Sequence, residues 1–549
     1  MNRRSFLQRS SAYAPNGAGP NAGTETGTIP RHNLPGMRES VASISSGDLT
    51  PYTPRPDKPW DTRRAAHLLR RAGFGPTWEE ITAAVASTPA AVVDAMLADA
   101  PMPDPPPASN GDFPWYTDIH LSPDNSQLQQ YYSAAATLQE WWTALMLQPS
   151  MMLREKMVLF WHNHFVSEYA KVLVTPFMLT QNQLFRQNAL GSFKELTKQV
   201  TIDPAMLIYL DGTTSKAGNP NENYARELLE LFTIGVGKYA DGTAHYSEHD
   251  IVELARALTG WRVNSTTASE FKPASFDNGN KTILGATGNF GIQGKAAMDV
   301  IDLIFDQTDK DLGKKRAAVF VCSKLYQYFV YDTPDMDIVA GMAETMVAND
   351  WKIGPVLRQL LLSEHFMDDN VIGARIKSPV EFVLGSIRQL HLNAGITPTS
   401  RNNTDIGKQG LHDPLTAESY LAQTLLAPPN VKGWPGGRSW ISSATVPLRI
   451  RYSQLWIDPI SGQDGGYGFA PVPFVKSLPD AKTDVNKLLD HLLELMLPLA
   501  ITDDARKPLL DALLAGGQTY EWDPDAANAG PRIKDCLIAI AGLGEYQLT

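Results

Sequence analysis

The sequence predicts an all-α fold, and two observations carry that prediction. From Asp61 onward, apolar residues recur at the 3.6-residue spacing of helices that bury one face. Strict alternation of apolar and polar residues, which predicts strands, is confined to short pieces near residues 269–286. We therefore expect a mainly helical array with long loops and minimal β structure.

The individual helices follow from this spacing and from the Gly- and Pro-rich text between the periodic segments. In chain order they are 61–72, 77–85, 88–98, 126–148, 151–167, 192–202, 221–234, 247–260, 296–307, 312–330, 335–348, 378–392, 415–427 and 484–497, with two more near the C-terminus. Long loops are expected at 209–220, 262–295 and 428–440. Loops of this length are often functional, so they are candidate site segments.

Composition divides the chain into a tail and a folded part. Residues 1–58 are rich in Gly, Pro, Ser, Thr and Asn, which predicts a disordered tail. Residues 59–549 form the predicted helical domain, which we expect to be sub-divided near 262–295 and 458–480.

The N-terminus supports two interpretations. MNRRSFLQ is similar to a twin-arginine export motif, with Arg3, Arg4, Phe6 and Leu7 in suitable places. A signal peptide also needs an apolar stretch of about 7–15 residues, and residues 9–50 contain none. The segment is either a degenerate export signal of a periplasmic or extracellular protein, or the tail of a cytoplasmic one.

Overall composition limits the classes of partner. Hydrophobic residues make up 43% of the chain and aromatic residues 9%, as in globular proteins. The net charge of −11 argues against nucleic acid and anionic lipid, which need a basic surface. No stretch reaches the ~20 apolar residues of a membrane span. Cys322 and Cys536 lie in apolar helical text, which favours buried free thiols over a disulfide.

The segment from Asn219 to Trp261 has the clearest local signals. Pro220 suits the start of the first helix, and Gly235 with Gly237 suits its end. Ser247 and Asp250 have the spacing of a capping box for the second helix.

The first helix of this segment carries a cluster of charged residues. Glu222, Arg226 and Glu230 follow one another at i, i+4 and i+8, which favours a ladder of ion pairs. The alternative is a catalytic or metal role for Glu227 and Glu230 beside Arg226, because inward-facing carboxylates on helices bind metals and transfer protons.

Two histidines lie close together in Trp161-His162-Asn163-His164. On a helix, positions i and i+2 point in different directions, so His162 and His164 cannot bind one ion unless the helix breaks. We favour histidines hydrogen-bonded in a helical core over metal ligands. The metal hypothesis needs helices 151–167 and 221–234 to pack together, so that a histidine reaches Glu227 or Glu230.

The loop at 428–440 is stiffened by three prolines and three glycines. Trp434 and Trp440 could form a binding platform, but we favour a loop fixed to the helical core by these rings. Asn430 and Lys432 are the polar residues that we expect to face a site.

Several of these stretches resemble a known family. NPNENYARELLELFTIGVGKY, YSEHDIVELARALTGW and PPNVKGWPGGRSW are similar to signature blocks of the bacterial family called domain of unknown function 1800 (DUF1800). Further similar blocks are AAHLLRRAGFGPTWEEI (65–81), LREKMVLFWHNHFVSE (153–168) and KSPVEFVLGSIRQL (377–390), so the resemblance runs from about residue 61 to the end. One departure is Phe276 before Asp277, where the family usually has a His-Asp pair.

The resemblance implies function only in outline. Family members often carry export signals and are commonly encoded beside a twin-arginine-exported protein of the DUF1501 family. The first hypothesis is therefore an exported, non-enzymatic protein that works with a DUF1501-like partner. The second is a metal-assisted hydrolase or oxidoreductase, in which His162, His164, Glu227 and Glu230 hold a divalent metal. We favour the first, because the sequence contains no complete catalytic constellation.

Overall fold

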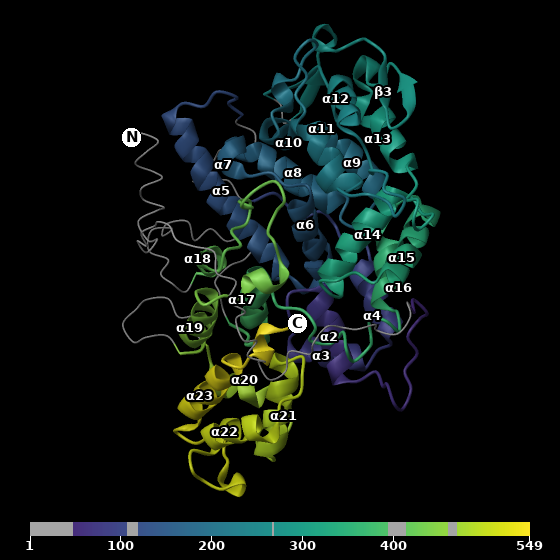
Figure 1. Ribbon diagram of the computed structural model, residues 1–549. Coiled ribbons are helices and arrows are strands. Elements are labelled where there is room, and N and C mark those ends of the chain that lie inside the picture. The colour runs from purple at the N-terminus through teal and green to yellow at the C-terminus, as the bar shows by residue number, and fades with distance from the viewer. Residues whose placement is uncertain (1–47, 107–118, 266–267, 393–412, 459–468) are drawn as a thin grey trace, which may run out of the picture. The chain divides into compact units, whose positions relative to one another are not determined.

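Helices dominate the computed structural model, which describes residues 48–106, 119–265, 268–392, 413–458 and 469–549 (Figure 1). The helices of the first half are α2 (Thr62–Ala72), α3 (Trp78–Val85), α4 (Pro89–Leu97), α5 (Asn125–Met146), α6 (Met152–His164), α7 (Tyr169–Val172), α8 (Thr175–Gln187), α9 (Phe193–Thr201), α10 (Pro204–Tyr209), α11 (Asn223–Glu227) and α12 (Glu248–Ala257). Those of the second half are α13 (Ala296–Asp306), α14 (Arg316–Phe329), α15 (Met336–Ala348), α16 (Ile353–Leu361), α17 (Pro379–Gln389), α18 (Pro414–Tyr420), α19 (Thr445–Ile457), α20 (Pro471–Lys476), α21 (Val485–Met496), α22 (Asp503–Leu514) and α23 (Ala529–Ala541). The predicted fold class is confirmed.

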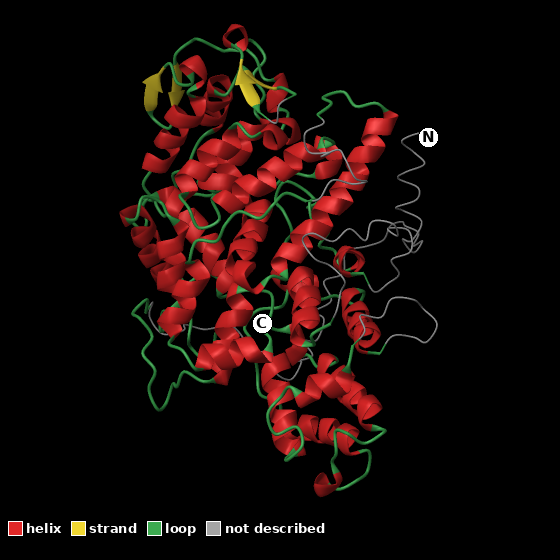
Figure 2. Cartoon of the chain, turned by 180° about the vertical axis from the view of Figure 1, so that it is seen from behind, coloured by secondary structure: helices red, strands yellow, loops and turns green. Residues whose placement is uncertain are grey.

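The β structure is as sparse as predicted. Among the described residues, the strands β1 (Trp261–Val263), β2 (Ser269–Phe271), β3 (Lys281–Ile283) and β4 (Ala286–Gly288) form two antiparallel pairs. Trp261 pairs with Phe271 in the first, and Lys281 with Gly288 in the second. Seen from behind, the strands stand out against an otherwise helical chain (Figure 2).

The predicted elements differ from the structure in three respects. The helix expected at 415–427 stops at Tyr420, because the backbone turns left-handed at Ala422 (φ 73°) and Leu426 (φ 61°). Helices α7, α8, α10, α16, α19 and α20 were not predicted. The predicted tail also ends too late: Tyr52 is buried, and its backbone N–H donates to the Leu362 carbonyl at 2.7 Å. Residues 48–58 therefore belong to the folded part, while 1–47 lie outside the described residues.

The cap signals of the charged segment are confirmed, with one shift. Ser247 and Asp250 form the predicted capping box of α12. The first helix begins at Asn223, later than expected, and the Asn221 side-chain oxygen accepts from the Asn223 N–H at 2.9 Å. From Leu228 to Thr233 the chain continues as a π-helix, an element that often occurs at functional sites.

Helix α6 lies in the core and positions much of the site. Eleven of its thirteen residues are buried, among them the charged residues Glu155 and Lys156. Arg186 of α8 donates to both oxygens of Glu155, at 2.5 and 2.8 Å. Lys156 pairs with Glu381 of α17. Because each buried charge has an opposite charge, α6 is held at a fixed place between α8 and α17.

The two cysteines are buried free thiols, as predicted. Burial raises the pKa of the Cys536 thiol to about 12. Of the helices in the described ranges, none has the length and apolarity needed to cross a membrane.

Candidate functional site

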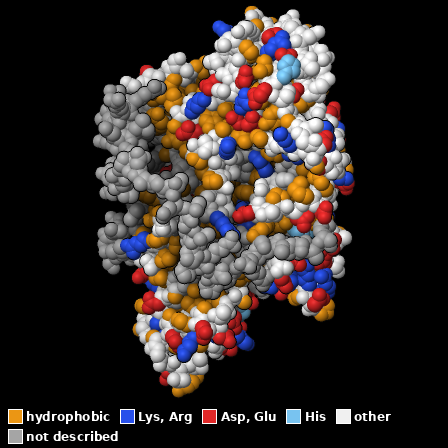
Figure 3. Space-filling view, in the orientation of Figure 1, with side chains coloured by type: hydrophobic (Ala, Val, Ile, Leu, Met, Phe, Trp, Pro, Cys, Tyr) orange, Lys and Arg blue, Asp and Glu red, His pale blue; other side chains and the backbone are white. Residues whose placement is uncertain are grey.

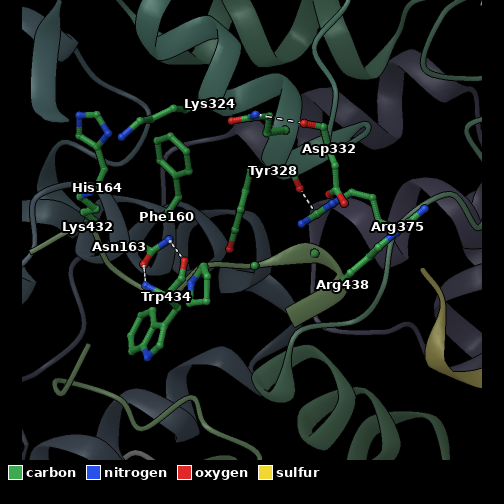
Figure 4. A pocket seen from close by; sticks show the side chains of 14 residues that line it. Phe160, Asn163, His164, Lys324, Tyr328, Asp332, Arg375, Lys432, Trp434 and Arg438 are labelled. Carbon is green, nitrogen blue, oxygen red and sulfur yellow. Dashed lines mark hydrogen bonds between the residues drawn. The ribbon is translucent and has the colours of Figure 1, made fainter. Parts of the chain in front are cut away.

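A pocket of about 490 Å³ lies between α6, α14, the segment that carries Arg375, and the loop at 428–440 (Figure 4). A volume of this size suits a small molecule. Its lining is Phe160, Asn163, His164, Lys324, Gln327, Tyr328, Asp332, Arg375, Lys432, Trp434, Pro435, Gly436, Gly437 and Arg438.

The loop is fixed to α6 through its backbone. The Asn163 side-chain oxygen accepts from the Trp434 N–H at 2.6 Å, and the Asn163 amide donates to the Trp434 carbonyl at 3.5 Å. Gly433 (φ 79°) makes this approach possible, since a Cβ there would lie 2.2 Å from the Asn163 side-chain oxygen. The loop therefore keeps one position against the helix.

Trp434 and Trp440 are buried, each with 5% of its surface exposed. The Trp434 ring lies 5.7 Å from the His162 ring, measured between centroids. Such burial is required if the two rings fix the loop to the helical core. The two polar residues expected to face a site are both exposed. Lys432 lines the pocket, whereas Asn430 is not part of the lining and accepts from the Lys432 N–H at 2.9 Å.

The pocket concentrates positive charge. Four of its lining residues are cationic, namely Lys324, Arg375, Lys432 and Arg438, and Asp332 is the acidic one. Within the described part of the chain, none of the four cations forms an ion pair with a carboxylate. The outer face in Figure 3, in contrast, shows acidic and basic side chains interspersed. Unpaired cations in a concave site attract anions.

Arg375 is held by two segments that are distant from it in the sequence. Its backbone N–H donates to the Thr549 carbonyl at 3.4 Å, and the Thr549 N–H donates back to the Arg375 carbonyl at 2.8 Å. Its guanidinium donates to the Tyr328 carbonyl (Figure 4) and lies 5.6 Å from the Tyr328 ring centre. These contacts aim the guanidinium at the pocket without neutralising it.

His164 lines the pocket and contacts the π-helix. Its Nε2 is 2.9 Å from the Phe232 carbonyl oxygen, while its Nδ1 is buried without a hydrogen-bond partner. Burial, followed by the charge of Lys324, lowers the pKa of His164 well below the ordinary value. The imidazole is therefore neutral at physiological pH.

His162 has different surroundings, as its helical position requires. Its ring contacts those of Trp142, Phe185 and Trp434, and burial lowers its pKa to about 3. Its Nε2 has no hydrogen-bond partner. The two histidines thus lie in separate aromatic environments.

The charged residues of α11 form the ion-pair ladder. Arg226 pairs with Glu222 at 3.3 Å, with Glu230 at 3.4 Å and, from α12, with Glu248 at 2.9 Å. Glu227 stands apart from these pairs. Burial, then the charge of Glu230, raises its pKa, while Arg226 and, to a smaller extent, Lys432 of the loop act in the opposite direction. Glu227 is therefore near the pocket loop but is not part of the pocket lining.

Helix α6 and the π-helix meet as the metal hypothesis requires, but through the Phe232 carbonyl and His164. Among the side chains that the structure describes, no three His, Cys, Asp or Glu residues form a group able to hold a metal ion. The metal set His162, His164, Glu227 and Glu230 stays a prediction. Metal analysis of the purified protein tests it.

A family model described as "Protein of unknown function (DUF1800)" matches residues 67–548. The chain belongs to the DUF1800 family. Neither the curated proteins nor the solved structures contain a match. The DUF1800 resemblance of the sequence blocks is thereby confirmed over nearly the whole chain.

The departure at Phe276 has a structural account in this DUF1800 chain. The Phe276 ring is buried, and the Lys281 ammonium lies 4.4 Å from its centre. The neighbouring Asp277 accepts from Arg256 at 2.9 and 3.0 Å, which keeps its pKa below the ordinary value. Phe276 and Asp277 therefore support the loop at 262–295, outside the pocket lining.

Sequence reasoning missed Lys324, Arg375 and Arg438 as site residues. For Lys324 a signal existed: Phe320 and Tyr328 flank it at i−4 and i+4, so a lone lysine lies on an aromatic helix face. Arg375 had no such signal, because it enters the pocket through contacts with residues far away in the sequence.

Proposed function

We propose that the protein binds a small ligand bearing an anionic oxygen group (carboxylate, sulfate or phosphate) in the pocket beside the loop at 428–440. The observation that carries the proposal is the set of four pocket cations without an ion-pair partner in the described residues. Of the buried cations outside the pocket lining, Lys156 and Arg186 pair with carboxylates, whereas Arg70, Arg71 and Arg449 donate to backbone carbonyls. What distinguishes the four pocket cations is that they gather around one cavity. A protein of net charge −11 that leaves these four unpaired has a place for an external anion.

The pocket also favours a ligand with an apolar part. Phe160 and Tyr328 lie between the Lys324 side and the Arg375 side in the view of Figure 4. Guanidinium groups bind carboxylate and phosphate in a forked geometry, and aromatic rings cover the apolar part of a ligand. The expected occupant is a small organic anion.

Binding is tested by titrating the protein with sulfate, phosphate and citrate in a calorimeter. We expect saturable binding that weakens at least about tenfold in Arg375→Gln, because each charge-assisted hydrogen bond contributes about 1.5–3 kcal/mol. Lys487→Gln is the matched control, since Lys487 is exposed and lies outside the pocket. Equal affinity in wild type and Arg375→Gln contradicts the proposal.

We further propose that the protein is exported and acts with a DUF1501-like partner. Support comes from the family membership and from the twin-arginine-like start, which lies outside the described residues. A reporter fused to residues 1–58, with Arg3 and Arg4 changed to lysine as the control, tests export. Co-purification with the protein encoded beside it tests the partner. A reporter that stays in the cytoplasm would contradict export.

A further inference from the structure

Lys324 differs from the other pocket cations in its surroundings. Its Nζ donates to the Leu231 carbonyl at 2.9 Å and lies 4.8 Å from the centre of the Phe320 ring. Burial lowers its pKa to about 8. Compared with an exposed lysine, far more of this amine is uncharged near neutral pH, and the uncharged amine is a nucleophile.

A neutral base lies beside this amine. The Phe232 carbonyl can only accept a hydrogen bond, so His164 Nε2 carries the proton and Nδ1 keeps its lone pair. Nδ1 has no hydrogen-bond partner. Figure 4 shows Lys324 extending toward the His164 ring, and the lysine charge acts on that histidine. An amine next to an imidazole acceptor is the arrangement of an activated nucleophile.

We propose that Lys324 forms an imine with a carbonyl compound that also carries a carboxylate, a 2-oxo acid being the simplest case. The inference rests on the proposed anion site, because Lys432, which Figure 4 shows on the same side of Phe160 as His164 and Lys324, is the pocket cation that would hold the carboxylate. The amine nitrogen attacks the carbonyl carbon, and the carbonyl oxygen takes up a proton. The resulting carbinolamine then loses water as the C=N bond forms. One amine and one carbonyl give one imine and one water, with no oxidation or reduction.

The pairing of functions explains why both kinds of group line one pocket. A carboxylate held by Lys432 places the adjacent carbonyl near the Lys324 amine, which raises the effective concentration of the electrophile. His164 Nδ1 can accept the proton that the nitrogen loses during attack. Replacing His164 should therefore slow imine formation, but Lys324 should still become modified.

The experiment is reductive trapping with pyruvate and sodium cyanoborohydride, followed by peptide mass mapping. The hydride adds to the imine carbon and a solvent proton to the nitrogen, which leaves a stable secondary amine. We expect one pyruvate adduct on Lys324, its loss in Lys324→Arg, and suppression by excess sulfate. Lys194→Arg is the matched control, because Lys194 is also half-buried but pairs with Asp302 outside the pocket.

The outcomes separate the two proposals. Pyruvate binding in the calorimeter without an adduct on Lys324 overturns imine formation and leaves the anion site standing. Absence of both binding and adduct overturns both. Adducts spread equally over many lysines also overturn the inference. So does labelling of Lys324 by acetone, which carries no charge, to the same extent as by pyruvate. Mapping of the wild-type protein identifies the lysine directly, even if Lys324→Arg does not fold.

Discussion

Replacing Trp434 with alanine tests whether this ring fixes the pocket loop. The side chain is 95% buried, packs against His162, and sits between the two Asn163 hydrogen bonds. An aromatic side chain buries about 150–250 Å². At ~25 cal/mol per Å² this area corresponds to about 4–6 kcal/mol, and measured losses for such truncations are about 3–5 kcal/mol. We therefore expect the free energy of unfolding to fall by about 3–5 kcal/mol.

Urea unfolding followed by circular dichroism measures this change, and thermal denaturation checks its direction. Tyr520→Ala is the control: that ring is 83% exposed, so its loss should change stability by no more than about 0.5 kcal/mol. Anion binding should weaken in Trp434→Ala, because Lys432 and Arg438 belong to the same loop. An unchanged unfolding midpoint would refute the reasoning and make the loop a ligand-contacting element instead.

Three further predictions use the same unfolding assay. Gly433→Ala should lower the free energy of unfolding by about 2–5 kcal/mol through left-handed strain and overpacking, because its Cβ would lie 2.2 Å from an α6 side chain. The control Gly436→Ala meets no atom within 4 Å and should cost only about 1–2 kcal/mol. Equal losses in the two variants would contradict this. Burial raises the pKa of Asp203 from 3.8 to about 7, so the folded state binds the proton of this carboxyl more tightly than the unfolded state does. The free energy of unfolding should therefore fall as the pH rises from about 4 to about 7. Asp203→Asn should remove this part of the pH dependence. Glu155→Gln should cost about 3–5 kcal/mol, because it leaves a buried guanidinium unpaired, but Arg226→Gln, in half-exposed pairs, at most about 1 kcal/mol.

Local signals predicted the helices where the residues that decide them are close in sequence. The capping box at Ser247 and the glycine end at Gly235 are examples, since both depend on contacts within a few residues. Helix α8 was not predicted, although Pro176 is typical of the first turn of a helix. The end of α18 could not be predicted, because left-handed Ala422 has no sequence signature.

The site was predictable only in part, for a related reason. The loop at 428–440 could be recognised from its tryptophans, prolines and glycines. Lys432, which was expected to face a site, lines the cavity. Arg375 lines the same cavity because Tyr328 and Thr549 hold it there. Such long-range contacts leave no periodicity or spacing in the sequence. The two histidines were recognised as candidates because they are close in sequence. In the structure His164 lies beside the cation Lys324 of the pocket, whereas His162 lies among aromatic rings.

The packing of Trp434 against α6 has a consequence for biosynthesis. Asn163 leaves the ribosome 271 residues before the loop that covers it. At about 5–20 residues per second, that interval lasts roughly 15–55 s. Throughout it, the aromatic surface around His162 lacks its cover, and exposed apolar surface of this kind promotes aggregation. Slow translation or a premature stop before residue 428 would therefore yield chains that depend on chaperones, and the pocket would be among the last features of the molecule to form.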